Sequence, residues 1–307
     1  MYLTQMNIGC LILNYYDYQE TIGCVNNLEQ IDVDMVFRIV IVDNHSPNDS
    51  YEILKKQFSK NKNVIVIQAN VNEGYAKGNN IGFRFFAKYF PEIKYVILMN
   101  PDTRLIRYST VYDLAKVLTQ NKDIALVAPV AILNGVVDYV SSAWNTPTLK
   151  DLVRNHCKFV KYKSKQFINA SSKGLIRVDA VQGAFYMVRM DALKKVNYLD
   201  EGTFMYCEEV LLSRDLRKAG YREAVLCDDF FEHNHKSRTS IITLKKRLVS
   251  EKNFYKSRLV YCKKHLGRGS SFALTFVHYL NNVYILVTHP IVKIMMIKHP
   301  LKSTETL

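Results

Sequence analysis

The carboxylate with the clearest chemical setting is Asp102, which ends the run YVILMNPD at residues 95–102. The apolar part of this run predicts a buried strand, and Pro101 stops further sheet pairing directly after it. Ligands bind at the carboxyl ends of strands in open α/β sheets, so Asp102 could reach a metal ion or a phosphate-bearing substrate. The alternative is that Asp102 caps a helix that follows it.

Two polar stretches in the first half could bind a nucleotide. Asp43 and Asn44 follow a β-branched run, where they could hydrogen-bond a ribose or a base, or form an Asx-turn before Pro47. The glycines of residues 74–82 open a predicted helix, where backbone N–H groups can approach an anion closely. Tight packing of that helix on the sheet is the alternative explanation of the same glycines.

Acids and histidines in the second half form two further candidates. Glu208 and Glu209 lie near the start of a predicted helix, where acids favour the helix dipole, but the aromatic and apolar residues before them suggest a lined pocket. A carboxylate in such a pocket would gain a raised pKa and act as a general base. His233 and His235 could bind a metal or simply lie on the surface. No Cys or third His lies nearby to complete a zinc site made by protein alone.

A parallel α/β sheet must position these residues. Apolar runs alternate with helical segments, and each run is apolar throughout, as expected for strands that helices cover on both faces. Asn14, Asp43 and residues 100–102 each follow a strand, so they should converge on one edge of the sheet as a nucleotide-type crevice. The predicted strands are 8–13, 36–42, 64–67, 95–99, 124–130, 176–181 and 223–227, and the main predicted helices are 18–30, 48–59, one from the glycine segment to about 89, 109–120 and one that ends at 218.

The composition is that of an ordinary globular protein. The 307 residues are 48 % hydrophobic and 23 % charged, with a net charge of +14 that favours anionic partners such as nucleic acid, an anionic membrane surface or phosphorylated small molecules. The six cysteines are scattered without metal-ligand spacing and predict free thiols in a reducing compartment. The first residues lack the basic and apolar segments of a signal peptide, so a cytoplasmic location is expected.

The order and spacing of these motifs resemble the family 2 glycosyltransferases over about residues 6–240. Within that family, the resemblance is greatest to the rhamnosyltransferase-like branch that builds bacterial surface polysaccharides. Each motif is weak alone, but the ordered series is specific. The motifs are Ile12-Leu13-Asn14-Tyr15, Val42-Asp43-Asn44-x-Ser46, Asn72-x-Gly74-Tyr75-Ala76-x-Gly78-Asn79-Asn80-x-Gly82, Leu98-Met99-Asn100-Pro101-Asp102, Gly183-Ala184-Phe185, Glu208-Glu209 to Arg214 and a late His-x-x-x-Ser.

The resemblance implies a GT-A fold and inverting transfer from a nucleotide-diphosphate sugar linked to dTDP or UDP. By the same resemblance, Asp43 would hold the nucleoside, with Asn14 and Asn44 nearby. The full set of residues expected to bind the nucleotide sugar is Asn14, Asp43, Asn44, Gly74, Ala76, Gly78, Asn79, Asn100, Asp102 and Gly183.

The resemblance also implies a divalent metal, Mg²⁺ or Mn²⁺. Asp102 would occupy the last position of the family's metal-binding motif, with Asn100 and Pro101 in place of the earlier acid found in many relatives. With a single carboxylate, the site would rely on the donor phosphates and on His233 or His235 to complete the coordination.

The base of the reaction is expected at the paired acids. By the resemblance, Glu209 would take the proton from the acceptor hydroxyl and Glu208 would be its neighbour, although the residues leave open which of the two acts. Leu211 stands where relatives usually have an acid, so a mechanism that needs a third carboxylate is disfavoured.

The expected organisation is a catalytic domain at 1–240, with a nucleotide-sugar-binding half at 1–130 and an acceptor or catalytic half at 131–240. Residues 241–307 form a helical extension, because apolar residues recur at helical spacing and an apolar, aromatic segment follows. Asn281, Asn282 and Pro290 interrupt this segment, which makes it a poor membrane-spanning helix. The extension could pack on the catalytic domain, lie on the inner face of the cell membrane, or form a homo-oligomer interface.

The sequence therefore predicts transfer of a sugar to a hydroxyl of a glycan or polyprenyl-linked acceptor in capsule or other surface-polysaccharide synthesis. Rhamnose is favoured by the resemblance alone. The alternatives are a sugar-nucleotide nucleotidyltransferase, although NYYD after the first strand is not the glycine-rich, basic loop it would need, and a non-catalytic scaffold. Nucleic acid is not an expected partner, because the basic residues are dispersed along the sequence and no recognised binding motif occurs.

Overall fold

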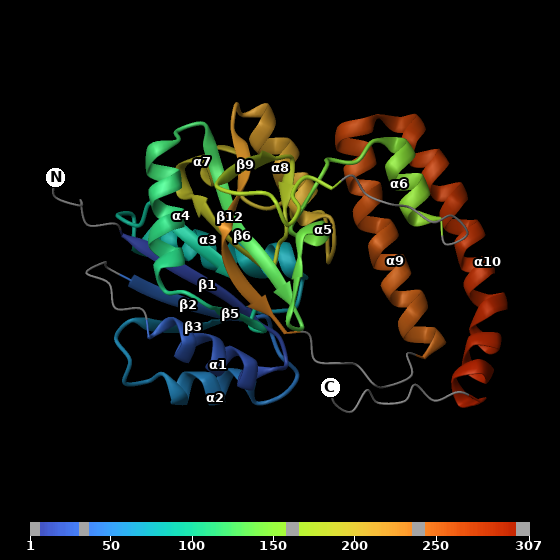
Figure 1. The fold of residues 1–307 in the computed structure, drawn as a ribbon. Coiled ribbons are helices and arrows are strands. Elements are labelled where there is room, and N and C mark those ends of the chain that lie inside the picture. Colours follow the sequence, from blue (N-terminus) through green and yellow to red (C-terminus); the bar gives the residue numbers. More distant parts are fainter. Residues whose placement is uncertain (1–6, 31–36, 158–165, 235–242, 299–307) are drawn as a thin grey trace. The chain divides into compact units, whose positions relative to one another are not determined.

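The structure, a computed structural model, describes residues 7–30, 37–157, 166–234 and 243–298. The chain forms two compact units (Figure 1): the first is Met1–Thr146 with Ser164–His235, and the second is Pro147–Lys163 with Lys236–Leu307. The second unit thus includes a segment that the sequence analysis placed in the 131–240 half.

The first unit is built on a sheet with ten strands among the described residues. The strand order is β3-β2-β1-β4-β11-β6-β12-β5, with β7 paired to β6 and β9 paired to β12, while β8 and β10 form a separate pair. The strands are β1 Ile8–Asn14, β2 Phe37–Asp43, β3 Val64–Gln68, β4 Tyr95–Met99, β5 Thr103–Leu105, β6 Ile124–Leu133, β7 Val136–Asp138, β8 Ala143–Trp144, β9 Leu175–Val178, β10 Ala180–Val181, β11 Phe185–Arg189 and β12 Arg222–His233.

The first four strands run parallel, as their apolar sequences predict. β1 lies between β2 and β4, and β2 also pairs with β3. Because parallel neighbours end on the same side, Asn14, Asp43 and Asn100 lie along one edge of the sheet, as expected. The helices of this unit are α1 Tyr18–Leu28, α2 Ser50–Gln57, α3 Tyr75–Tyr89, α4 Ser109–Gln120, α5 Tyr139–Ser142, α7 Met190–Lys195 and α8 Glu208–Lys218.

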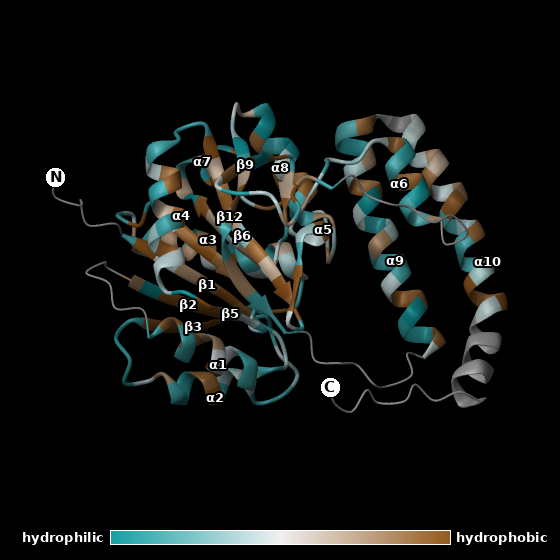
Figure 2. Ribbon diagram, viewed as in Figure 1, coloured by the Kyte–Doolittle hydropathy of each residue, from teal (hydrophilic) through white to brown (hydrophobic). Residues whose placement is uncertain are grey.

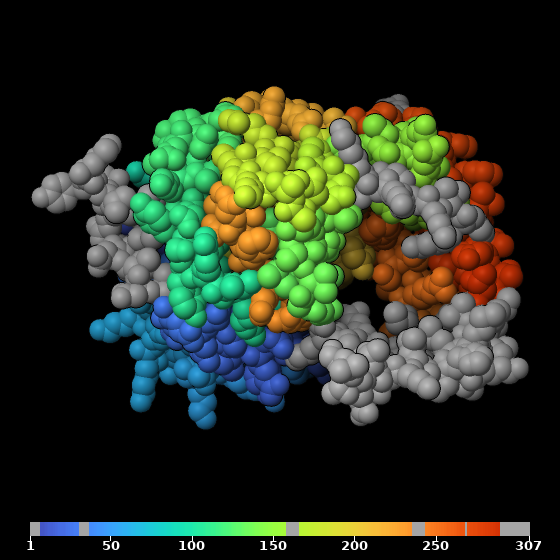
Figure 3. Space-filling model, viewed as in Figure 1, coloured from blue at the N-terminus to red at the C-terminus, as the bar shows by residue number. Residues whose placement is uncertain are grey.

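Alternate side chains of the sheet enter two buried clusters. Ile12 of β1 packs in one cluster with Val25 of α1 and Leu114 of α4, whereas Leu11 packs in the other with Phe83 of α3. Figure 2 shows these strands in brown, the hydrophobic end of the scale. In the space-filling view of Figure 3, side chains of α4 and of the yellow-green segment that precedes α7 cover the side of the first unit that faces the viewer.

Two features depart from a simple parallel series. β11 runs antiparallel between β4 and β6, so the fifth predicted strand does not lie beside the fourth. Asp102 leads into the short strand β5, and the next helix, α4, begins only at Ser109. The interpretation of Asp102 as a helix cap is therefore wrong, and its side chain remains at the edge of the sheet.

The second unit consists of helices in its described part: α6 Leu149–His156, α9 Leu244–Tyr261, the π-helical turn η1 Cys262–Leu266 and α10 Arg268–Lys298. The buried Tyr261 donates from its hydroxyl to the carbonyl oxygen of Pro147 over 3.0 Å, and Asn281 Nδ2 donates to His156 O over 2.6 Å. These bonds join α6 to helices that lie about a hundred residues later in the chain. Among the described helices, α10 included, none combines the length and hydrophobicity that a membrane crossing requires.

Candidate functional site

A buried hydrogen-bond cluster joins the ends of β1 and β2. The Asp43 carboxylate accepts hydrogen bonds from Asn14 Nδ2 at 2.7 Å, from Ser46 Oγ at 2.7 Å and from Ser46 N at 2.9 Å. Thr21 Oγ1 donates to Asn14 Oδ1 at 2.7 Å, and both Asp43 and Asn14 are fully buried. The cluster therefore fixes the positions of the two strand ends. A role of these residues in holding the nucleoside stays a prediction.

Asn44 connects the end of β2 to the start of α3. Its Nδ2 donates to Asn72 Oδ1 at 3.1 Å and to Gly74 O at 3.2 Å. Gly74 has a φ of +101°, and a Cβ there would collide with the backbone of Phe204, whose carbonyl oxygen accepts from Tyr75 N at 2.7 Å. Only glycine satisfies both conditions. This contact holds the loop before α8 against the start of α3.

The rest of the glycine segment packs inside the unit. A Cβ at Gly78 would come within 2.7 Å of Leu13 Cδ1, so this glycine allows α3 to lie close to the sheet. Ala76 is fully buried, and Asn79 Nδ2 donates to a carbonyl of the preceding turn at 3.0 Å. These contacts agree with the alternative explanation of the glycines, which is tight packing of the helix on the sheet. Donor binding by Ala76, Gly78 and Asn79 stays a prediction.

Tyr75, the first residue of α3, bridges two segments of the site. Its hydroxyl lies 2.9 Å from Gly183 O and 3.2 Å from Asn100 Oδ1. Burial raises the pKa of Tyr75 well above its usual value, and nearby acids add to the effect, so the hydroxyl keeps its proton. Tyr75 had no predicted role of its own. It ties the end of β4 to the turn before β11.

Glu209, in the first turn of α8, lies against that same turn. The Gly183 backbone hydrogen-bonds the Glu209 carboxylate, and a Cβ on Gly183 would collide with Glu209 Oε1. Burial raises the pKa of Glu209, while hydrogen bonds from its own backbone and from Gly183 oppose the rise. A carboxylate with a raised pKa is a stronger base near neutral pH, as a general base must be.

Glu208 is the more deeply buried member of the pair, with 4 % of its surface exposed. Desolvation, and next the charge of Glu209, raise the pKa of Glu208 to about 8, against hydrogen bonds from Thr203 and from the backbone. Just before it, Tyr206 and Cys207 have φ of 77° and 68°, in the left-handed region that is unfavourable for residues other than glycine. Two carboxyl groups with raised pKa values therefore follow a strained turn.

Asp102 and His233 form the third part of the site. Antiparallel pairing of β12 with β5 sets His233 opposite Thr103. His233 Nε2 lies 3.4 Å from Asp102 Oδ1, and Asn234 N donates to Asp102 O at 3.0 Å. The His233 side chain is almost completely buried, and that of Asp102 is 28 % exposed. The two side chains therefore offer an oxygen and a nitrogen at one end of the sheet.

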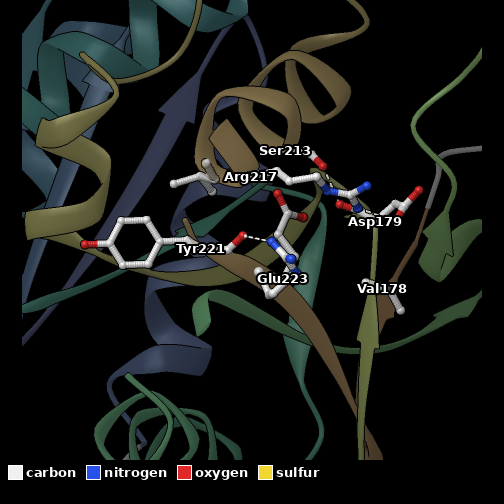
Figure 4. A pocket seen from close by; sticks show the side chains of 8 residues that line it. Val178, Asp179, Ser213, Arg217, Tyr221 and Glu223 are labelled. Atoms are coloured by element: carbon white, nitrogen blue, oxygen red, sulfur yellow. Dashed lines mark hydrogen bonds and ion pairs between the residues drawn. The ribbon is translucent and has the colours of Figure 1, made fainter. Parts of the chain in front are cut away.

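A narrow crevice lies elsewhere in the first unit, beside α8 (Figure 4). It is too narrow to hold a water molecule, so it is not a substrate site. Its notable residue is Glu223, which is 3 % exposed and accepts a hydrogen bond from Val181 N at 3.0 Å. Burial raises the pKa of Glu223 well above its usual value. The crevice is lined by Val178, Asp179, Ser213, Leu216, Arg217, Tyr221, Arg222 and Glu223.

The family model described as "Glycosyl transferase family 2" matches residues 12–196, more than half of the chain. The chain belongs to glycosyltransferase family 2. One relative of this glycosyltransferase is the low-salt glycan biosynthesis hexosyltransferase Agl10 of Haloferax volcanii, which is 24 % identical over 206 residues. That alignment covers 66 % of this chain and 59 % of the relative, so the family 2 chain spans less than two thirds of the relative's length.

Solved structures of glycosyltransferases show the same fold at low sequence identity. GalNAc-T7 with UDP, GalNAc and Mn²⁺ has a TM-score of 0.61 and 13 % identity, over 98 % of this chain and 59 % of its own. The mannosyltransferase PcManGT of Pyrobaculum calidifontis with GDP-Man and Mn²⁺ has a TM-score of 0.58 and 10 % identity, over 99 % and 77 %. Residues 1–349 of S. aureus TarS with UDP-GlcNAc have a TM-score of 0.55 and 14 % identity, over 83 % and 65 %. The expected GT-A fold is confirmed.

The side chains of Asp102 and His233 fit the divalent metal that the fold family implies. A carboxylate oxygen and an imidazole nitrogen lie 3.4 Å apart, and no group of three or more ligating side chains occurs in the described part of the chain. Mg²⁺ and Mn²⁺ accept such a sparse set, because substrate phosphates and water fill their remaining positions. His235, the other predicted ligand, lies outside the described residues.

Proposed function

We propose that this family 2 glycosyltransferase is an inverting enzyme that moves a sugar from a nucleotide diphosphate to a hydroxyl of a glycan or lipid-linked acceptor. The observation that carries the proposal is the Tyr75 hydroxyl, which lies within hydrogen-bond distance of both Asn100 and Gly183. Gly183 in turn contacts Glu209, and Asn100 lies two residues before Asp102. Tyr75 thereby connects the turn that contacts the candidate base to the strand end that precedes the candidate metal ligand.

Glu209 is the proposed base. Its carboxylate takes the proton of the acceptor hydroxyl while the hydroxyl oxygen bonds to the anomeric carbon and the bond from that carbon to the diphosphate oxygen breaks. A single displacement of this kind inverts the anomeric configuration. We assign the retained proton of the pair to Glu208, because burial and the charge of Glu209 raise the pKa of Glu208 to about 8. Gly183 orients the Glu209 carboxylate by its hydrogen bond.

The remaining residues bind and position the donor. Asp43, with Asn14 and Asn44, is proposed to hold the nucleoside at the edge of the sheet, where Asn14 and Asp43 end adjacent strands and Asn44 follows Asp43. A divalent cation, Mg²⁺ or Mn²⁺, bound by Asp102 and His233 would neutralise negative charge on the diphosphate as it departs.

The finer identity of the substrates follows from the resemblance. Rhamnose linked to dTDP is the first candidate donor, and UDP-linked sugars are the second. Surface polysaccharide, including capsule, is the proposed product. Phe204 and Met205, each 42 % exposed, precede the paired acids and offer apolar surface against which an acceptor sugar could pack.

Binding of the donor tests the proposal first. A ligand that binds only the folded state raises the thermal midpoint, so dTDP-rhamnose, UDP-sugars and GDP-mannose are each added with and without Mn²⁺. The expected result is a shift with one nucleotide class that grows when Mn²⁺ is present. Release of the nucleoside diphosphate with an acceptor then measures transfer. Absence of a shift with every donor would overturn the assignment of the donor site.

A further inference from the structure

One face of α10 carries large apolar side chains that the second unit leaves exposed. Phe272 is 83 % exposed, Tyr279 is 73 % exposed and Phe276 is 65 % exposed, and Val283, Leu286 and Val287 continue the series. Their spacing of three and four residues places them on one side of the helix. We call these six residues the apolar stripe.

The opposite side of α10 is buried within its own unit. Leu274, Asn281 and Ile285 are buried, and the ring of His278 stacks on that of Tyr255 in α9 with a centroid distance of 4.0 Å. Asn281 also bonds α6, as described above. In Figure 1, α10 lies alongside α6 and α9, in agreement with their contacts. The orientation of the helix is therefore fixed by packing, and the apolar stripe is the side that faces away from the unit.

The positive charge of the protein is concentrated in this same unit. The second unit has 19 lysines and arginines against three acids, a net charge of +16, whereas the first has 23 against 25, a net charge of −2. Fourteen of these 19 basic residues lie in the tail, 236–307, and the fold adds the five of residues 147–163. Lys252, Lys256, Lys263 and Lys264 are exposed in the described part of the unit.

We propose that the second unit docks on an anionic lipid surface, with the apolar stripe inserted at the headgroup boundary and exposed lysines of the same unit against lipid phosphates. An amphipathic helix with aromatic residues on one side and cationic neighbours has the composition of an interfacial helix. The docking does not depend on the transfer reaction, so it can be tested apart from donor binding.

The charge distinguishes this partner from the others that could cover the stripe. Two copies joined through this face would bring two units of +16 together, and the repulsion would oppose association. A double-stranded nucleic acid would satisfy the charge, but its bases are already stacked on one another and would leave the exposed phenylalanines without an apolar partner. An anionic bilayer satisfies both, because its phosphates and its acyl chains meet at one surface.

Vesicle flotation with the full chain tests the proposal. Vesicles of phosphatidylcholine with 30 % phosphatidylglycerol are compared with vesicles of phosphatidylcholine alone. The variant Phe272→Ser/Phe276→Ser/Tyr279→Ser should bind anionic vesicles at least about 10-fold more weakly than wild type. Its matched control is Ile106→Ser/Tyr89→Ser/Val136→Ser, which removes three exposed apolar side chains from the first unit and should bind as wild type does. Binding of the wild type should also weaken as salt rises.

A second measurement follows the stripe itself. Phe276→Trp should show a blue-shifted emission on addition of anionic vesicles, with Trp144 as the single native tryptophan to subtract. Equal vesicle binding by the stripe variant and wild type, or no blue shift, would overturn the proposal. A wild type that is dimeric in light scattering, with a monomeric stripe variant, would assign the face to a second copy and likewise overturn it. The stripe variant should retain transfer to a water-soluble acceptor, so loss of docking and failure of the proposed reaction are distinguishable.

Discussion

Nε2 of His233 lies 3.4 Å from Oδ1 of Asp102, across the antiparallel pairing of β12 with β5. The relationship supports the proposal that a motif with only one carboxylate serves a metal. The carboxylate would supply one ligand, and the imidazole would supply another from a distant part of the chain. His233 is almost completely buried, so its ring is held by packing before any cation binds.

Removal of either group should weaken metal binding. Asp102→Asn and His233→Ala are each expected to lower Mn²⁺ affinity by about 10-fold or more, because each takes one of two protein ligands from the site. The backbone carbonyl of residue 102, which accepts from Asn234, is unchanged by the first substitution. Titration of Mn²⁺ in the presence of nucleoside diphosphate measures the affinity directly. Asp123→Asn, on an exposed acid that pairs with Arg177, is the control.

Replacement of the proposed base should stop transfer and leave the affinity for the donor almost unchanged. Glu209→Gln keeps the shape of the side chain and its contact with Gly183 but cannot accept the proton, so kcat should fall by about 10²–10⁴-fold. The affinity for the donor, measured by calorimetry, should change little. Turnover near that of the wild type would contradict the role of Glu209. A similar loss in Glu208→Gln with Glu209→Gln active would assign the base to its neighbour.

The Tyr75 bridge predicts a milder loss. Tyr75→Phe removes the hydroxyl that lies close to both Asn100 and Gly183, leaves a buried carbonyl without this partner, and should cost about 1–3 kcal/mol of stability. Transfer should slow as well, since the turn that orients Glu209 is less firmly held. Tyr95→Phe is a matched control, because its hydroxyl contacts only Thr119 among the hydrogen bonds described. Equal transfer rates in the two variants would show that the bridge is structural only.

A methyl group at residue 183 should displace the base. A Cβ on Gly183 would collide with the Glu209 carboxylate, so Gly183→Ala is expected to reduce the rate of transfer by about 10-fold or more, with little change in unfolding temperature. Gly269→Ala, where nothing lies within 4 Å of the added atom, is the control. An unchanged rate in Gly183→Ala would mean that the carboxylate does not act from this position.

The strand ends could be predicted from the sequence because each one has a local signal. Asn14, Asp43 and Asn100 each follow an unbroken apolar run, and parallel pairing then brings them to one edge. No local signal of this kind predicts that β11 runs antiparallel between β4 and β6. The apolar sequence of this strand is equally suited to either direction between two buried neighbours.

The parts that escaped prediction depend on tertiary contacts. Tyr75 has the appearance of an ordinary first-turn aromatic, and its contact with Gly183 spans 108 positions in the chain. Glu223 has the appearance of a surface acid at the start of a strand, but the fold buries it against Val181. The positive charge of the tail can be read from the sequence, but only the fold shows that the basic residues of Pro147–Lys163 belong to the same unit.

The raised pKa of Glu208 makes the stability of the first unit depend on pH. The folded protein holds this proton up to a pH of about 8, whereas the unfolded chain releases it near the ordinary value of about 4.5. Between these values the folded state binds more protons than the unfolded state, so the free energy of unfolding should fall as pH rises from about 4.5 to about 8. The slope from one such group is at most about 1.4 kcal/mol per pH unit.

Glu208→Gln should remove this contribution, because the amide has no proton to lose. Denaturant unfolding of the first unit at several pH values should give a flatter profile than that of the wild type over this window. Glu52→Gln, an exposed acid in α2, should retain the wild-type profile. A variant profile as steep as that of the wild type would place the titrating proton on another group. In that case, the assignment of the base to Glu209, which assumes that Glu208 keeps its proton, would lose its support.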